Sequence, residues 1–208
     1  MTLLSGVDSS SACTTAALGC LQSSGIAFVG RYYSRTTQIA GEKLTQSEAQ
    51  LILSAGMHIV TVYEDGPTSY SYFSASRGTA DAQGALQQAA AVGQPKGTTI
   101  YFTVDYDATS SDIAGNIKLY FQAIDQAFNG VYYVGVYGSG SVCSAMKSAG
   151  LATYAWLAQS TGWSGYANFN GWVIKQGLEG SVCGLNSDTD VAQNDFGGFN
   201  FLSYMTTT

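Results

Sequence analysis

The feature that most constrains this chain is the alternation of short apolar runs with segments of helical period. Eight runs have the length and composition of buried strands, at 3–8, 27–33, 57–64, 98–105, 131–137, 153–159, 172–176 and 188–193. Five of them are followed by helical patterns, whereas the segments after the sixth and seventh are short and rich in Gly and Asn. Because such alternation produces parallel strands with right-handed crossovers, it predicts an α/β fold.

Eight strands predict a closed (β/α)8 TIM-type barrel, a small single domain over 1–208 with truncated helices after strands six and seven. The length of 208 residues is near the lower limit of about 200 for such a barrel. An open doubly wound sheet is the alternative. Its glycine-rich phosphate loop is missing, since Asp8-Ser9-Ser10-Ser11 follows the first strand.

Two helices have distinct sequence signals. The stretch Thr45-Gln46-Ser47-Glu48 is a capping box, in which the Thr hydroxyl and the Glu carboxylate satisfy the first free amides. Apolar residues at three- and four-residue steps predict one continuous helix ending at Gly130, and these residues are Ile113, Ile117, Phe121, Ile124 and Phe128.

Charge and hydropathy exclude several classes of partner. Charged residues make up 11% of the chain and the net charge is −6, so nucleic acid and anionic membranes are not expected partners. No apolar run reaches the length of a membrane span. The start, MTLLSGVDSS, lacks the features of a signal peptide and is typical of a strand. Low charge with abundant Gly, Ser, Thr and Tyr nevertheless favours a protein of the extracellular space or cell envelope. We expect it to be a monomer.

The four cysteines are not spaced as zinc ligands, and the only histidine is His58, at the start of its strand and expected to be structural. Cys13 and Cys20 are about 10 Å apart along a predicted helix, too far to bridge, so both are expected to be buried free thiols. A disulfide between Cys143 and Cys183 is left open by the sequence.

Acidic residues stand where several predicted strands end. In a barrel these carboxyl ends surround one mouth, which is the usual place for chemistry. Strand alternation places Tyr101, Thr103 and Asp105 on the inner face and Ile100, Phe102 and Val104 on the outer face. We therefore expect Asp8 to lie near Asp190, and Glu64 near Asp105. The acids concerned are Asp8, Glu64, Asp105, Asp107, Asp188 and Asp190.

Clustered carboxylates raise one another's pKa values, so that one stays protonated while another is ionised. Cleavage of a glycosidic bond needs this combination of an acid and a base or nucleophile. A Ca²⁺ or Mg²⁺ site is the alternative, but no EF-hand loop is present, and we expect neither metal nor cofactor. Asp107, before Ala108-Thr109-Ser110, suits a loop or capping role equally well.

Aromatic residues form a second signal, because sugar rings stack on aromatic faces. Those able to border the mouth are Tyr106, Tyr137, Trp156, Trp163, Tyr166 and Trp172. Trp172 suits core packing better, and Trp156 suits either role. Trp163 and Tyr166 lie in a polar, glycine-rich loop, which favours a binding platform.

The order of these motifs resembles a known family. They are Gly6-Val7-Asp8, Gly30-Arg31-Tyr32-Tyr33, Tyr63-Glu64-Asp65-Gly66, Tyr101-Phe102-Thr103-Val104-Asp105-Tyr106-Asp107, Gly135-Val136-Tyr137-Gly138, Ala155-Trp156-Leu157-Ala158-Gln159 and Asp188-Thr189-Asp190-Val191-Ala192-Gln193. Together they resemble the glycoside-hydrolase-like barrel domains of uncharacterised function found in actinobacterial secreted proteins. Those domains are in turn similar to the family 25 lysozymes.

The lysozyme resemblance implies a β/α barrel that cleaves the muramic acid linkage of peptidoglycan. Its motif has an Asp on the first strand, Asp-x-Glu after the fourth and an acid on the last, matched here by Asp8, Asp105 and Asp190. Asp107 stands where the lysozymes have their general-acid Glu, and its side chain is one methylene shorter. Glu64, on the neighbouring strand, is our candidate for that role.

We therefore expect a glycoside hydrolase acting on a cell-wall (peptidoglycan-like) or other N-acetylated polysaccharide. Glu64 would donate the proton, Asp105 would act as nucleophile or charge stabiliser, and Asp8 and Asp190 would orient the substrate, with Asp107 a further catalytic candidate. The alternative is an inactive glycan-binding barrel, which the residue at Asp107 favours. The expected substrate-binding residues are Arg31, Tyr32, Tyr106, Tyr137, Trp156, Gln159, Trp163, Gln176 and Asp188.

Overall fold

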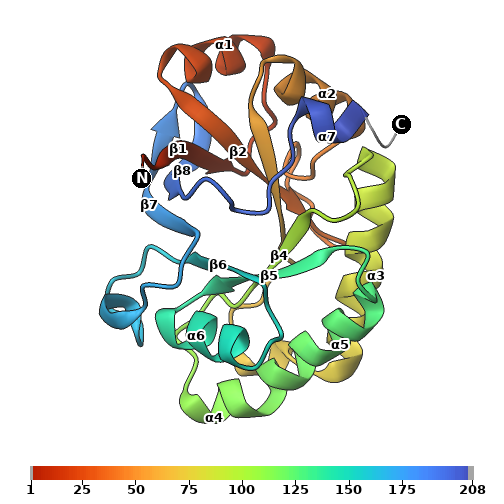
Figure 1. Ribbon diagram of the computed structural model, residues 1–208, viewed down its shortest axis with the longest axis vertical. Coiled ribbons are helices and arrows are strands. Elements are labelled where there is room, and N and C mark those ends of the chain that lie inside the picture. Colours follow the sequence, from red (N-terminus) through yellow and green to blue (C-terminus); the bar gives the residue numbers. More distant parts are fainter. Residues whose placement is uncertain (1, 206–208) are drawn as a thin grey trace.

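The centre of the molecule is a closed barrel of eight strands that pair in sequence order, β1 to β8 (Figure 1). The structure is a computed structural model that describes residues 2–205. The strands are β1 Leu4–Ser9, β2 Ile26–Tyr33, β3 His58–Tyr63, β4 Thr99–Thr103, β5 Tyr133–Gly138, β6 Tyr154–Leu157, β7 Ile174–Val182 and β8 Leu185–Ala192. The expected closed barrel is therefore confirmed over the open sheet.

The last strand runs opposite to the other seven. Pairs β1–β2 through β6–β7 are parallel, whereas β8 is antiparallel to both β7 and β1. The prediction of eight parallel strands was wrong here, because β7 and β8 form a hairpin with no crossover. Its two turn residues, Cys183 and Gly184, have φ of 54° and 80°. Two successive left-handed residues are the geometry of a tight two-residue hairpin turn.

Helices follow each of the first five strands. They are α1 Thr15–Ser23, α2 Gln46–Ser54, α3 Ala75–Val92, the short α4 Ser110–Asp112 with α5 Lys118–Phe128, and α6 Gly140–Ser148. After β6 there is only the 3₁₀ helix η3 Tyr166–Asn168, as expected for a truncated connection. The larger helices surround the barrel, and the β7–β8 side at the left of Figure 1 has none of them. Among residues 2–205, none of the helices has the length and hydropathy of a membrane span.

The predicted helix ending at Gly130 is interrupted near its start. Ile113–Ile117 forms a π-type turn, η2, in which Gly115 has φ −92° and ψ −116°, outside the helical region. The helix resumes as α5 and ends at Asn129 in the left-handed conformation. Ile113 and Ile117 remain buried, so the apolar period predicted the buried face correctly but not the break.

Two apolar layers lie on either side of the barrel wall. Ile100 and Phe102 belong to the outer layer, between strands and helices, while Tyr101 belongs to the inner layer. The predicted alternation along β4 is therefore confirmed. The inner layer consists of Phe28, Val60, Val62, Tyr101, Trp156, Ile174, Ala192 and Phe196.

Phe196 closes the end of the barrel opposite the mouth. Its ring centroid lies 4.8 Å from that of Phe28 and 6.0 Å from that of His58. The hydroxyl of Tyr101 donates a hydrogen bond of 2.7 Å to the carbonyl of Phe196. His58 therefore belongs to the barrel floor, as expected for a structural residue.

A disulfide joins Cys20 in α1 to Cys183 at the tip of the β7–β8 hairpin. The expectation that Cys20 is a free thiol was wrong, and a Cys143–Cys183 bridge is excluded because Cys183 is already bonded. Cys13 and Cys143 are free and buried. Helical spacing excludes a bridge within α1, but it carries no information on the distance between α1 and a hairpin 163 residues away.

Candidate active site

A cavity of 230 Å³ opens at the carboxyl ends of the parallel strands. Most of the side chains predicted to act or to bind substrate line it, namely Asp8, Tyr32, Glu64, Asp105, Tyr137, Trp156, Gln159, Trp163, Gln176 and Asp188. Val62, Thr103 and Ser160 also line it and were not among the predicted site residues. Thr103 could have been predicted as a lining residue, since alternation along β4 already placed it on the inner face. We call this space the central cavity.

Asp8 is held rigidly at the base of the central cavity. Tyr32 donates from its hydroxyl to Asp8 Oδ1 at 2.6 Å, and Gln176 donates from Nε2 to Asp8 Oδ2 at 3.0 Å. Gly30 faces Asp8, and a Cβ at Gly30 would lie 2.7 Å from the Asp8 Cβ. Burial raises the pKa of Asp8, and the hydrogen bonds from Tyr32 and Gln176 act against that rise.

The amide of Gln176 organises one side of the cavity. Its Nε2 also donates to Asp188 Oδ2 at 2.8 Å. Its Oε1 accepts from the hydroxyl of Tyr137 at 2.8 Å and from the backbone N–H of Gln159 at 3.3 Å. One buried amide therefore fixes two carboxylates and a tyrosine, because its donors and acceptor are all used.

The direction of β8 sets the depth of its two aspartates. Asp188 pairs with Asp8, whereas Asp190 pairs with Gly6, which lies two residues deeper along β1. Asp188 lines the central cavity, and Asp190 is buried below it. A parallel β8 would have given the opposite order, since Asp190 would then stand nearer the mouth. Burial, together with the charges of Asp8 and Glu179, raises the pKa of Asp188 to about 6.

Asp190 acts on the cavity through Asp8. The indole Nε1 of Trp156 donates to Asp190 Oδ1 at 3.0 Å, while Oδ2 finds no donor among the described residues. Burial raises the pKa of Asp190 well above its usual value, and the charge of Asp8 adds to this. The raised pKa favours the protonated form, and a proton on Asp190 would provide a hydrogen-bond donor for Asp8 and account for the otherwise unpartnered oxygen.

Glu64 immediately follows β3. Its pKa is raised further above the usual value than that of Asp188. Burial raises the pKa of Glu64 to about 8, with further contributions from the charges of Asp105, Asp8, Glu42 and Asp188. Hydrogen bonding to the charged form would lower this pKa, but no residue from 2 to 205 donates to the carboxyl. Glu64 is therefore mostly protonated at neutral pH and lines the cavity as a proton donor.

Asp105 lines the same cavity, in the loop that follows β4, the strand next to β3. Its backbone N–H donates to the carbonyl of Pro67 at 3.0 Å, which fixes the start of the loop. The side chain is half-buried, and this burial raises the pKa of Asp105. Within residues 2–205, no group of three or more His, Cys, Asp or Glu is arranged to hold a metal ion.

Arg31, predicted to bind substrate, lies outside the cavity. It is fully buried and pairs with Glu48, with 2.7 Å between Arg31 Nε and Glu48 Oε1. The same Glu48 oxygen accepts from the backbone N–H of Cys13 at 2.8 Å. Only half of the expected capping box is therefore formed, by Thr45 Oγ1 accepting from Glu48 N at 3.2 Å. The Glu48 carboxylate pairs with the buried guanidinium of Arg31 and therefore does not close the capping box.

Tyr106 and Asp107 also point away from the cavity. The hydroxyl of Tyr106 donates to Asp112 Oδ2 at 3.3 Å, and its ring packs 6.1 Å from that of Phe73. Asp107 is exposed and accepts a hydrogen bond of 2.8 Å from the backbone N–H of Ser164. Asp107 thus ties its own loop to the loop that carries Trp163.

The two tryptophans of the central cavity differ in exposure. Trp156 is 1% exposed and packs edge-on against Tyr137, with ring centroids 5.9 Å apart, so it forms part of the cavity floor. Trp163 is only partly buried and stands on the wall. Tyr166 and Trp172 do not line the cavity, and Lys175 covers the ring of Tyr166 at 4.9 Å.

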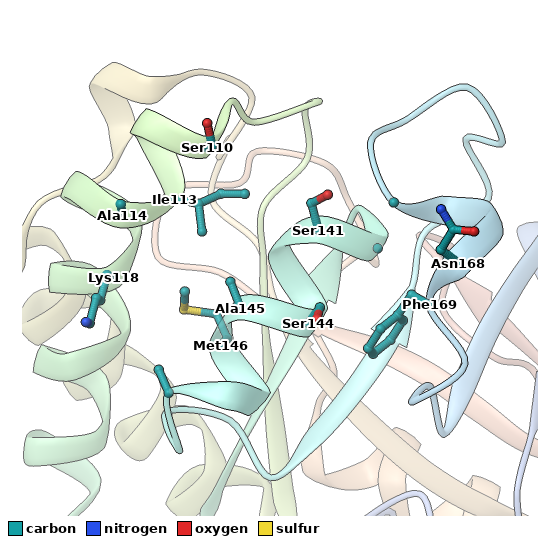
Figure 2. Close-up of a pocket in the computed structure, with 13 residues that line it drawn as sticks. Ser110, Ile113, Ala114, Lys118, Ser141, Ser144, Ala145, Met146, Asn168 and Phe169 are labelled. Carbon is teal, nitrogen blue, oxygen red and sulfur yellow. The ribbon is translucent and has the colours of Figure 1, made fainter.

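A second pocket, of 540 Å³, shares no lining residue with the central cavity (Figure 2). Helix α6, with Ala145 and Met146, stands between the segment of Ile113 and Lys118 and the loop that carries Phe169. Lys118 is the only charged side chain among its described lining residues, and no predicted site residue contributes to it. It lacks the paired acids of the central cavity.

Comparison with known proteins supports the sequence resemblance. The sequence model of the Rv2525c-like, glycoside hydrolase-like domain matches residues 19–193. The uncharacterised protein YbfG of Bacillus subtilis (strain 168) is 34% identical over 210 residues, a match that covers 90% of this chain and 29% of YbfG. The chain therefore spans less than a third of the length of this relative.

Two solved structures show the same fold. The Tat-secreted protein Rv2525c of Mycobacterium tuberculosis, in complex with L-tartrate, has a TM-score of 0.82 at 21% identity, covering 95% of this chain and 99% of its own. The bacterial lysozyme from Streptomyces coelicolor has a TM-score of 0.59 at 13% identity, covering 100% of this chain and 98% of its own. At these identities the likeness concerns the fold alone.

Proposed function

Because the chain belongs to the Rv2525c-like, glycoside hydrolase-like domain family, we propose that it hydrolyses a cell-wall (peptidoglycan-like) or other N-acetylated polysaccharide. The observation that carries this proposal is that Glu64 and Asp105 line the same cavity. Glu64 has a pKa of about 8 and keeps its proton at neutral pH, while Asp105 is a second carboxyl in that cavity. Two carboxyl groups in different protonation states are what glycosidic cleavage requires.

In the proposed reaction Glu64 gives its proton to the glycosidic oxygen as the bond to the anomeric carbon breaks. Positive charge then develops on the sugar ring, and ionised Asp105 stabilises it or attacks the anomeric carbon as a nucleophile. Water completes hydrolysis and returns the proton to Glu64. Asp8, held by Tyr32 and Gln176, orients the sugar, and Asp190 acts only through its hydrogen bond to Asp8.

The substrate would be held by the polar and aromatic side chains of the cavity wall. Trp163 offers an aromatic face for a sugar ring, and Tyr32, Tyr137 and Gln159 offer hydrogen-bonding groups. Asp107 and Arg31 have no place in this proposal, because Asp107 bonds its neighbouring loop and Arg31 is paired with Glu48.

The test is release of reducing ends from purified peptidoglycan and from chitin-type glycans. We expect release by the wild type and a loss of about 10²-fold or more in Glu64→Gln and Asp105→Asn, since each variant keeps the shape but loses the carboxyl. Asp125→Asn, an exposed acid on α5, is the matched control and should behave as wild type. Full activity in Glu64→Gln would remove Glu64 from the proposed mechanism.

A glycan-binding barrel without turnover is the second candidate. The observation that favours it is Asp107, which occupies the sequence position of the lysozyme acid but faces Ser164 and not the cavity. Glycan retained in a pull-down, with no reducing ends released by the wild type, would support this candidate.

We also propose that the protein works outside the cytosol. The Cys20–Cys183 disulfide supports this, since such bonds persist in oxidising compartments. The Tat-secreted status of the structural neighbour Rv2525c agrees with it. Mass determination of the protein isolated from its natural compartment, with and without thiol alkylation, would test the proposal.

A further inference from the structure

Two further cavities adjoin the central cavity. A cavity of 100 Å³, here the hairpin cavity, shares Asp8, Tyr32 and Asp188 with it and is lined further by Glu179 of β7. A cavity of 300 Å³, here the loop cavity, shares Glu64 with it and is lined further by Glu42. We call the three adjoining cavities together the cleft.

The charge along the cleft has one sign. No Lys or Arg is among the described residues that line any of the three cavities. Asp65, in the loop cavity, is neutralised by Arg77 at 2.6 Å and by Arg35 at 3.7 Å. The other carboxyl groups that line the three cavities have no ion-pair partner within residues 2–205. They belong to Asp8, Glu42, Glu64, Asp105, Asp188 and Glu179.

The Glu64 carboxyl is open to a ligand. It is partly buried and lines both the central and the loop cavity, and no described residue forms a hydrogen bond to it. A ligand in the cleft can therefore contact this carboxyl directly. Asp8 and Asp188 are by contrast held by Gln176.

Electrostatics then distinguishes the substrates that suit the cleft. A groove lined by one sign of charge concentrates ligands of the opposite sign and repels ligands of its own sign. A glycan that carries carboxylates meets repulsion here, whereas a sugar with a free ammonium group meets attraction. In the central cavity, however, an ammonium group would favour the ionised form of Glu64 and so remove the proton that the reaction needs.

We propose, on the basis of the glycosidase or glycan-binding function above, that the cleft selects partly de-N-acetylated glycans. A neutral N-acetylated unit occupies the central cavity, and glucosamine-type units with free ammonium groups occupy the hairpin and loop cavities beside Glu179 and Glu42. The cation-bearing units are placed at the flanks, where these carboxylates are unpaired. This assigns a substrate class to the same site and two further specificity-determining residues.

Co-sedimentation with chitin particles tests the proposal in three states of the same particles: untreated, partly de-N-acetylated, and re-N-acetylated. We expect the apparent Kd to fall about fivefold for each ammonium group engaged, in line with a charge pair near 4 Å in water. Re-N-acetylation should restore the original value. The gain should shrink when salt rises from about 0.05 M to about 0.5 M, because exposed charges are then screened.

The specific variant is Glu42→Gln/Glu179→Gln, which removes two cleft charges and touches neither Glu64 nor Asp105. Its matched control is Asp125→Asn/Asp195→Asn, which removes two exposed charges elsewhere, on α5 and near Tyr154 at the start of β6. The two variants carry the same net charge. We expect the cleft variant to lose the preference for de-N-acetylated particles and the control to keep it.

Several outcomes would overturn the proposal: equal binding to all three particle states, an equal loss in both double variants, or equally tight binding to polylysine-coated particles. The last two would mean that net charge alone attracts the protein. Release of reducing ends from the same particles is scored separately. Binding preference without turnover would support the cleft assignment and contradict hydrolysis, whereas turnover without preference would do the reverse.

Discussion

Trp156 donates a hydrogen bond of 3.0 Å from its indole to Oδ1 of Asp190, inside the barrel and directly beneath the candidate site. This bond anchors an acid whose pKa is raised well above its usual value by burial and by the charge of Asp8, which favours its protonated form. Asn has the same shape as the protonated acid and can both accept from Trp156 and donate to Asp8. The pair therefore allows the protonation state of a buried carboxyl to be tested by isosteric replacement.

We expect Asp190→Asn to become more stable relative to wild type as pH rises from about 4 to about 7. The folded-state pKa of Asp190 is raised, so above about 3.9 the unfolded chain releases a proton that the folded chain keeps, and wild-type stability falls. Asn has no such proton. Urea denaturation across this pH range measures the difference, and a difference that does not change with pH would contradict it. Asp190→Ala should lose about 1–3 kcal/mol because the indole N–H is left unpartnered.

The second prediction concerns the pH dependence of hydrolysis. We expect kcat/KM to fall as pH rises through about 8, because Glu64 then loses the proton it must donate. On the acid side, activity should appear only above the raised pKa of Asp105, since that carboxyl must be ionised. Rates on a soluble glycan oligomer between about pH 4 and pH 9 would give both limbs.

A variant of Asp188 checks which group sets the alkaline limb. The negative charge of Asp188 is one of the causes of the raised pKa of Glu64. Asp188→Asn should therefore shift the alkaline limb to lower pH while activity persists at its new optimum. An unchanged limb would assign it to another group, and Asp125→Asn serves as the control that keeps the local field intact.

The third prediction separates stability from binding at Arg31. Arg31→Met should lower the free energy of unfolding by about 3–5 kcal/mol, because it leaves the Glu48 carboxylate buried without its partner. Under conditions in which the variant is folded, its KM for glycan should equal that of the wild type. Adding Glu48→Gln should restore part of the stability. A raised KM with unchanged stability would return Arg31 to the substrate-binding set.

The fourth prediction concerns the Cys20–Cys183 bond. It closes a loop with a sequence separation of 163, and removing such a constraint costs about 2–5 kcal/mol. Cys20→Ser/Cys183→Ser should therefore unfold at lower urea concentration than wild type. A thiol reductant should shift the wild type to the same midpoint and leave the double variant unchanged. A shift of the double variant by reductant would point to an effect unrelated to this bond.

Much of the barrel could be predicted because periodicity is a local property. Inner and outer residues of β4 follow from alternation, and the acids at Asp8, Glu64 and Asp105 follow from the positions where strands end. These side chains meet at the mouth because parallel strands bring their carboxyl ends together.

The remaining features depend on contacts that periodicity does not encode. An alternating pattern reads the same in both directions, so it could not tell that β8 runs antiparallel and exchanges the depths of Asp188 and Asp190. Glu48 has the spacing of a capping residue, but the buried charge of Arg31 competes for it more strongly. The partner of Cys20 likewise depends on where the β7–β8 hairpin stands in space.

The reversal of β8 also decides where the polypeptide leaves the barrel. Leu4 at the start of β1 pairs with Ala192 at the end of β8, and the following segment crosses to Phe199, which pairs with Ile59 of β3. Entry and exit therefore share the floor. A linker or neighbouring module joined at either side would extend from the base and leave the acidic opening facing outward.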